Sequence, residues 1–192
     1  MTLVVRMLAF TALGGLLGGC SDKAEIGDDE IMAQARTLTN PAAGLYEETT
    51  RILSAEVPGA PPAQADRLRD ELSGLKPNTA RRCITAEQAG AGFDRVLREM
   101  GEGINGMACR FTRFEASAPR MKAFLSCSGP DDAAAGLAMA GTTSAEGFDV
   151  TMDLDAQGAG IAGGAMKMRM QVMSRRIGDC PVPGSAEPPP SD

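Results

Sequence analysis

The chain has 192 residues, of which 43% are hydrophobic and 23% charged, a composition typical of a globular protein rather than a disordered one. Its net charge of -6, with no run of Lys and Arg, argues against a nucleic-acid partner. The complete lack of His excludes Ser-His-Asp and Cys-His nucleophilic sites and His-ligated zinc. We therefore expect no enzymatic activity and no cofactor.

The N-terminal residues 1–19 have the pattern of an export signal, in which Arg6 precedes the apolar run Met7 to Leu17. This run is too short to span a hydrocarbon core of about 30 Å. The stretch Leu17-Gly18-Gly19-Cys20 resembles the lipobox of bacterial lipoproteins, which implies cleavage before Cys20 and attachment of acyl chains such as palmitate to that residue. An ordinary signal peptide with an incidental Cys is the alternative. Ser21, by the enterobacterial sorting rule, favours the outer membrane over the inner one.

Residues 20–40 are polar and acidic, which predicts a flexible, lipid-anchored tether that holds the domain on the periplasmic side of the membrane. Within it, residues 29–38 could form one short helix. The folded domain is predicted to span residues 41–181, followed by a disordered Pro-rich tail at 182–192. Its first element, residues 44–57, is rich in strand-forming residues but alternates imperfectly, so we expect an edge strand.

Two short helices are expected in the first half of the domain. Residues 63–76 carry Leu and Ala at helical spacing. After a short strand at 82–84, Thr85 and Gln88 form a capping-box pattern that opens a second helix through Met100.

From residue 108 onward the hydrophobic period changes to two, which predicts an antiparallel meander. Its segments lie near 108–116, 120–127, 137–144, 148–155 and 163–173. Strict alternation would place Phe111 and Phe114 on opposite faces. The expected fold is therefore α+β and mainly β: a curved antiparallel sheet, half-barrel or barrel-like, of about six or seven strands, with two short helices.

Apart from Cys20, the chain has four cysteines, Cys83, Cys109, Cys127 and Cys180, an even number in an exported protein. Three pairings are formally possible. We favour Cys109 with Cys127, because the two segments that carry them flank a short loop, and this choice leaves Cys83 with Cys180. A four-thiolate zinc site would need closely spaced pairs, and the sequence has none.

Two further patterns suggest chemistry. The stripe Met166, Met168 and Met170 could bind Cu(I), because thioethers are soft ligands, although a strand with one buried face shows the same alternation. Carboxylates such as Asp131 and Asp132 could supply an acid and base for a hydrolase, but the sequence cannot place any two at the required separation. Neither pattern identifies a metal or catalytic residue.

Several sequence islands together resemble the proteobacterial domain of unknown function 3617 family. They are Asn40-Pro41-Ala42-Ala43-Gly44-Leu45-Tyr46-Glu47, Cys83-Ile84-Thr85, the Cys109 and Cys127 pair, and Ser174-Arg175-Arg176-Ile177-Gly178-Asp179-Cys180-Pro181. The resemblance implies a small exported protein, often a lipoprotein, with no established activity and no catalytic residues to carry over. This chain departs from the pattern in having Tyr46 where Trp is common, and in the helical insert between Ala63 and Pro77.

Together these observations predict an exported, lipid-anchored protein of the cell envelope. Its expected role is ligand binding or structural support rather than catalysis. Its expected partners are the membrane, through the lipid anchor, and either a small apolar ligand or another envelope protein. Cu(I) handling and a carboxylate-based hydrolase remain the alternatives.

The anchor gives a first prediction. Cys20→Ala removes the only acylation site that the lipobox offers, so we expect loss of lipid labelling and release from the membrane fraction, since several acyl chains are needed for firm anchoring. Metabolic palmitate labelling and membrane fractionation measure both effects. Normal fractionation of the Cys20→Ala protein would show that the anchor assignment is wrong.

Overall fold

The computed structural model describes residues 26–103, 106–158, 161 and 164–181. The predicted signal peptide at 1–19, the acylation site Cys20 and the tail at 182–192 lie outside these residues. Among the described residues, no helix combines the length and the apolar character that crossing a membrane requires.

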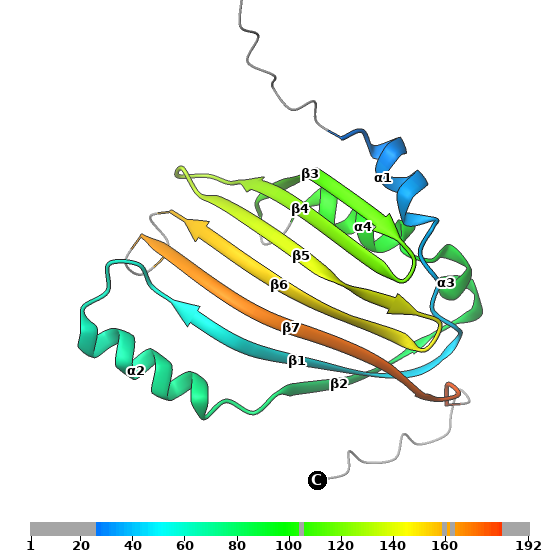
Figure 1. Ribbon diagram of the computed structural model, residues 1–192, viewed down its shortest axis with the longest axis horizontal. Coiled ribbons are helices and arrows are strands. Elements are labelled where there is room, and N and C mark those ends of the chain that lie inside the picture. The colour runs from blue at the N-terminus through cyan, green and yellow to red at the C-terminus, as the bar shows by residue number, and fades with distance from the viewer. Residues whose placement is uncertain (1–25, 104–105, 159–160, 162–163, 182–192) are drawn as a thin grey trace, which may run out of the picture.

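The fold is built on one antiparallel sheet of seven strands in the order β2-β1-β7-β6-β5-β4-β3 (Figure 1). The strands are β1 (Gly44–Glu56), β2 (Asn78–Ile84), β3 (Ala108–Ser117), β4 (Arg120–Ser128), β5 (Ala134–Ser144), β6 (Gly147–Gln157) and β7 (Ala165–Gly178). The last five form the predicted meander, in which each strand pairs with the next along the chain. The mainly-β α+β fold is thereby confirmed, and the sheet stays open with β2 and β3 at its edges.

Strand β1 lies inside the sheet, so its prediction as an edge strand was wrong. It pairs with β2 on one side and with the last strand, β7, on the other. Its imperfect alternation has another cause, a register shift against β7 between Ile52 and Ser54. A pairing between the first and last strands leaves no local signal in the sequence.

Four helices connect and flank the strands: α1 (Asp28–Ala35), α2 (Pro62–Ser73), α3 (Ala86–Ala91) and α4 (Asp94–Glu102). The capping box of Thr85 and Gln88 is present as predicted. The single helix expected after it is instead two, because Gly92 interrupts it with a φ of 58°, a conformation that only glycine adopts readily. The chain then resumes as α4.

Helix α1 falls within the segment predicted to be a flexible tether, and this part of that prediction needs correction. Its side chains Ile31 and Ala35 are 3% and 2% exposed and belong to the core. Within the helix, Gln34 accepts a hydrogen bond from the backbone amide of Ala116, and just beyond it Thr37 donates to the carbonyl of Ala116. The segment therefore covers the end of edge strand β3, where unpaired backbone groups would otherwise face solvent.

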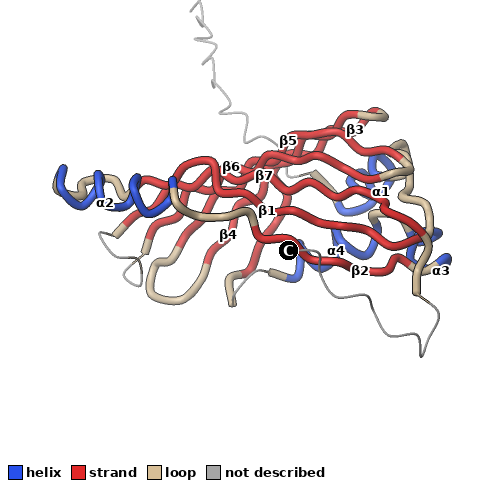
Figure 2. Tube along the Cα trace, turned by 90° about the horizontal axis from the view of Figure 1, so that it is seen from below, coloured by secondary structure: helices blue, strands red, loops and turns tan. Residues whose placement is uncertain are grey.

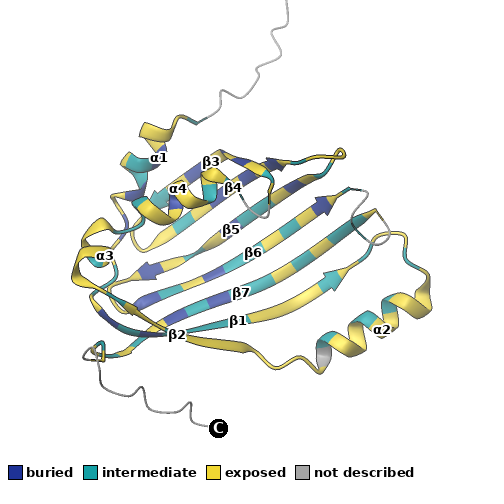
Figure 3. Ribbon diagram, turned by 180° about the vertical axis from the view of Figure 1, so that it is seen from behind, coloured by how far each residue is buried: buried dark blue, intermediate teal, exposed yellow. Residues whose placement is uncertain are grey.

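The sheet has one apolar and one polar face, because cross-strand partners share a face and neighbours along a strand alternate. One row on the apolar face runs through Phe114, Ala123, Met139, Met152 and Met170, and the adjacent row on the polar face runs through Arg113, Phe124, Ala138, Asp153 and Arg169. Helices α1 and α4 lie over β3 and β4 on the apolar face (Figure 3). Helix α2 projects from the opposite end of the sheet (Figure 2).

The main core forms where these helices meet the sheet. Its buried members are Ile31, Ala35, Leu97, Cys109, Phe111, Phe114, Ala123, Leu125, Cys127, Ala135, Met139, Val150 and Ala156. None of these residues belongs to β1 or β7, so the core is concentrated at the β3 side of the sheet.

Phe111 and Phe114 both point into this core, which corrects the expectation that they lie on opposite faces. Their rings are 5.8 Å apart in an edge-to-face arrangement. A register shift between Phe111 and Arg113 inserts one extra residue into β3 and reverses the alternation. A bulge of this kind depends on the partner strand and cannot be read from periodicity.

Both disulfides form as predicted. Cys109 and Cys127 face each other across β3 and β4 and are buried in the core. Cys83, near the end of β2, is joined to Cys180, two residues beyond β7. This second bridge fastens edge strand β2 to the end of the chain on the side of the sheet that lies away from the main core.

The two disulfides should contribute unequally to stability. The Cys83–Cys180 bridge closes a separation of 97 residues and Cys109–Cys127 one of 18. The chain-entropy model gives about 4.7 kcal/mol for a loop of about 100 residues and about 3 kcal/mol for one of about 15. We expect the Cys83→Ala/Cys180→Ala protein to unfold at a lower denaturant concentration than the Cys109→Ala/Cys127→Ala protein. The reverse order would show that packing around the buried bridge outweighs loop entropy.

Tyr46, the only tyrosine of the chain, is 1% exposed and ties the start of β1 to the turn between β5 and β6. Its hydroxyl donates to the carbonyl oxygens of Ala42 and Ala145, at 2.8 and 3.0 Å. Burial, and secondarily the carboxylate of Glu146, raise the pKa of Tyr46 above its ordinary value of 10.0.

This raised pKa predicts alkaline destabilisation. The unfolded chain releases the tyrosine proton near pH 10, whereas the folded chain retains it to higher pH, so the contribution of Tyr46 is intact below about pH 10 and is lost as the pH rises further. Because the chain also lacks Trp, tyrosinate absorbance reports on Tyr46 alone. We expect its ionisation to coincide with unfolding. Tyr46→Phe should lower stability by about 1 kcal/mol at neutral pH and remove this alkaline component.

Candidate binding trough on the polar face of the sheet

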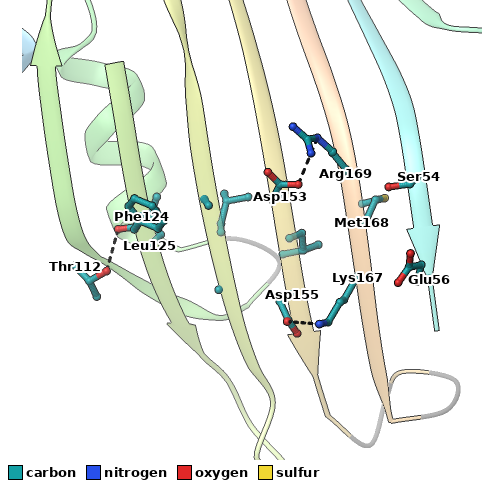
Figure 4. Close-up of a pocket in the computed structure, with 14 residues that line it drawn as sticks. Ser54, Glu56, Thr112, Phe124, Leu125, Asp153, Asp155, Lys167, Met168 and Arg169 are labelled. Atoms are coloured by element: carbon teal, nitrogen blue, oxygen red, sulfur yellow. Dashed lines mark hydrogen bonds and ion pairs between the residues drawn. The ribbon is translucent and has the colours of Figure 1, made fainter. Parts of the chain in front are cut away.

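A shallow trough of about 540 Å³ lies on the polar face, on the side of the sheet away from α4 (Figure 4). It extends from Thr112 on β3 across β4, β5, β6 and β7 to β1. Thr112 is the extra residue of the β3 bulge. The other side chains that face the trough lie in register on five strands: Phe124, Gly136, Ala138, Asp153, Asp155, Lys167, Arg169, Ser54 and Glu56.

The floor of the trough is strand β5, which presents only small residues to the polar face at its centre. Gly136 and Ala138 line the trough, and Ala140 continues it into a neighbouring hollow. The partners of Ala138 in the sheet are Phe124 on β4 and Asp153 on β6, both much larger. The contrast in side-chain size across three adjacent strands makes the trough.

One bank of the trough is aromatic, and a cation lies behind it. Phe124 is 37% exposed, although its strand β4 is paired on both sides. The guanidinium carbon of Arg113 lies 5.1 Å from the ring centroid, within the range of a cation–π contact. Thr112 donates a hydrogen bond to the carbonyl of Phe124, at 3.3 Å.

The other bank consists of two parallel ion pairs between β6 and β7. Asp153 lies 3.6 Å from Arg169, and Asp155 lies 3.5 Å from Lys167. All four side chains are more than half exposed, so each pair contributes about 1 kcal/mol or less to stability. Their donors and acceptors remain accessible from the trough.

Neither the backbone conformation nor the packing around Gly136 requires a glycine at this position of the trough. Its φ lies outside the left-handed region, and a Cβ atom built on it would meet nothing within 4 Å. Glycine within a strand costs about 0.5–1 kcal/mol relative to alanine. Since neither the backbone nor the packing needs glycine here, its effect is to leave the floor of the trough open.

The model of the DUF3617 family, described as a protein of unknown function, matches residues 41–180. The chain belongs to the DUF3617 family. The resemblance found in the sequence is thus confirmed, and the matched range contains the whole sheet, both disulfides and every residue of the trough. No curated protein and no solved structure matched the chain.

The DUF3617 domain has a second hollow of about 720 Å³ between α1, α4 and β3. Its wall includes Ile26, the first residue that the structure describes. The trough is the stronger candidate site because its floor is kept open by Gly136, a glycine that neither the backbone nor the packing requires.

The acidic pair Asp131 and Asp132, considered from the sequence as a source of catalytic carboxylates, has a conformational role in this DUF3617 domain. Both residues have positive φ, 54° and 56°, in the turn between β4 and β5. The amide of Ala133 donates to the carbonyl of Pro130, which closes the turn. Positive φ at both central positions is what the tight hairpin turn matched to strand twist demands, and Asp tolerates it better than most residues.

The methionine stripe faces away from Lys167 and Arg169, and only Met168 of the stripe also lines the trough. Met166, Met168 and Met170 share the apolar face as predicted, and Met152 stands directly opposite Met170. Within the described residues, no three His, Cys, Asp or Glu side chains are placed to hold a metal ion.

Sequence reasoning missed the trough itself. Each of its residues is ordinary in isolation, and only the register of five strands brings them together. The one available signal was Gly136, a glycine in the middle of a strand pattern with no turn to explain it.

Proposed function

We propose that this DUF3617 protein is an exported lipoprotein of the cell envelope, anchored through Cys20 on the periplasmic side of the outer membrane, that binds an uncharged sugar chain in the trough. The export signal and lipobox support the location, and two disulfides are compatible with an oxidising compartment. In this role the protein binds the sugar chain without catalysing a reaction on it.

The observation that carries the binding proposal is Gly136. The Cβ atom of an alanine there would meet no neighbour within 4 Å, and a β-branched residue would favour the strand conformation. Retaining a residue that weakens the sheet is expected where stability is exchanged for function. The trough that this glycine keeps open is therefore proposed as the ligand site.

The lining chemistry suits a sugar. A sugar ring has hydroxyl groups that need both donors and acceptors, and an apolar face that packs on an aromatic ring. The trough offers both, with carboxylates next to cations on one bank and the exposed Phe124 on the other. Its three carboxylates and two cations nearly balance, which disfavours a strongly charged ligand.

An extended peptide suits the trough less well. Peptides that bind sheets usually add a strand at an edge, where backbone donors and acceptors are free. The trough lies over β4 to β7, and each of these strands is paired on both sides. Sugar hydroxyl groups can form hydrogen bonds with side chains alone and do not need free backbone groups of the sheet. The trough therefore suits a sugar chain better than a peptide.

The proposed lack of catalysis rests on Asp153 and Asp155, the two trough carboxylates that pair with cations, while the third, Glu56, is exposed on β1. Glycoside hydrolysis needs one protonated acid and one ionised partner, kept distinct by different environments. Asp153 and Asp155 have similar environments, because each is more than half exposed and each pairs with a cation. This symmetry supports binding over hydrolysis.

Filling the floor tests the proposal. Gly136→Val should raise stability by about 0.5–1 kcal/mol and weaken sugar binding by at least about tenfold, because the added methyl groups occupy the ligand's place. Phe124→Ala should weaken binding by about two- to tenfold through the lost aromatic contact. The measurement is calorimetric titration with uncharged envelope-type oligosaccharides, beginning with a tetramer of N-acetylglucosamine.

Gly74→Ala is the matched control, since Gly74 follows α2, far along the chain from the trough, and should leave binding unchanged. Sugar binding is the wrong function if no oligosaccharide binds the wild-type protein, or if Gly136→Val binds as tightly as wild type.

A further inference from the structure

We propose that Met152, Met168 and Met170 form a Cu(I)-binding site on the apolar face of the sheet. By strand register the three methionines face away from Lys167 and Arg169, although Met168 also contributes to the lining of the trough. The Cu(I) proposal does not depend on the sugar-binding proposal.

The strand register brings the three thioethers together. Met152 on β6 is the direct partner of Met170 on β7, and Met168 is the diagonal neighbour two residues away on the same face. Direct cross-strand partners have Cβ atoms about 4.5–5.5 Å apart, and diagonal neighbours remain within reach of long side chains. The flexible methionine side chain allows three sulfur atoms to converge on one point.

The position of the site leaves it accessible. Helices α1 and α4 cover the apolar face over β3 and β4, whereas no described helix lies over β6 and β7 (Figure 3). Met152, Met168 and Met170 are accordingly only half-buried, in contrast to Met139, which is 4% exposed in the core. An ion can therefore reach these sulfur atoms without the sheet opening.

The ligand set selects the metal. Thioethers are soft ligands that favour Cu(I) over zinc, calcium or magnesium. The chain has no His, and the four cysteines of the domain are held in disulfides, so no imidazole or thiolate of the domain competes for the ion. Asp153, next in sequence to Met152, points to the polar face and pairs with Arg169.

Packing against the core accounts for methionine at only one of these positions, since Met152 borders the core and Met168 and Met170 do not. An uncovered sheet face would be served by Val or Ile, which favour strands more strongly and lose less conformational freedom. Exposed methionine is also open to oxidation to the sulfoxide. The three adjacent sulfurs are therefore better explained by a use of the sulfur itself.

The test removes the thioether sulfur of each proposed ligand while keeping the volume of the side chain. Met152→Leu, Met168→Leu and Met170→Leu preserve an apolar side chain of similar size, so the proteins should fold. The matched control is Met173→Leu, because Met173 is on the same strand but faces the polar side, opposite Asp149. Affinity is measured anaerobically by competition with a colorimetric Cu(I) chelator, and the methyl groups are followed by NMR with labelled methionine.

We expect each site variant to lose at least about tenfold in Cu(I) affinity, the loss that even an indirect change at a metal site produces, while Met173→Leu binds as wild type. The methyl signals of Met152, Met168 and Met170 should shift together on Cu(I) addition. Equal affinity of the wild type and the triple Leu variant, or a shift of Met173 as large as those of the three, would overturn the proposal. A wild-type protein that binds no Cu(I) at all would overturn it too, and would leave the stripe as an apolar surface.

Discussion

Seven strands share one apolar face, and the described helices that pack on it cover only the part over β3 and β4. Because part of the apolar face has no helix packed on it, the stability of that part depends on other interactions. A sheet normally buries its apolar face against a second layer, and here the main core draws on α1, α4 and β3 to β6 but not on β1 or β7. The uncovered half needs other means of support.

Those means differ between the two halves of the sheet. In the covered half, the Cys109–Cys127 bridge lies within the core and adds to dense packing. In the uncovered half, the Cys83–Cys180 bridge joins β2 to the segment after β7, and the buried Tyr46 ties the start of β1 to the turn between β5 and β6. Surface ion pairs such as Arg81–Glu47 add little. The covalent link thus stands where apolar burial is weakest, and there it joins the segments most distant in sequence.

The sequence predicted the features that are local and missed those that depend on pairing. Alternation located the five strands of the meander, and spacing favoured the correct disulfides, because both signals lie within short segments. The bulge that turns Phe114 into the core, the interior place of β1 and the packing of α1 on β3 all depend on contacts with distant strands. The trough was missed for the same reason, since the small size of Gly136 and Ala138 matters only beside Phe124 and Asp155.

The same stretch of β7 serves both faces. Lys167 and Arg169 face the trough, and Met166, Met168 and Met170 face the opposite side. A change at Met166 or Met170 should therefore leave the trough intact, because neither residue lines it, whereas Met168 lines the trough and could couple to its neighbours. If effects at Met170 and Arg169 proved strongly non-additive, the explanation would have to be movement of the β7 backbone itself, which the Cys83–Cys180 bridge constrains at only one end.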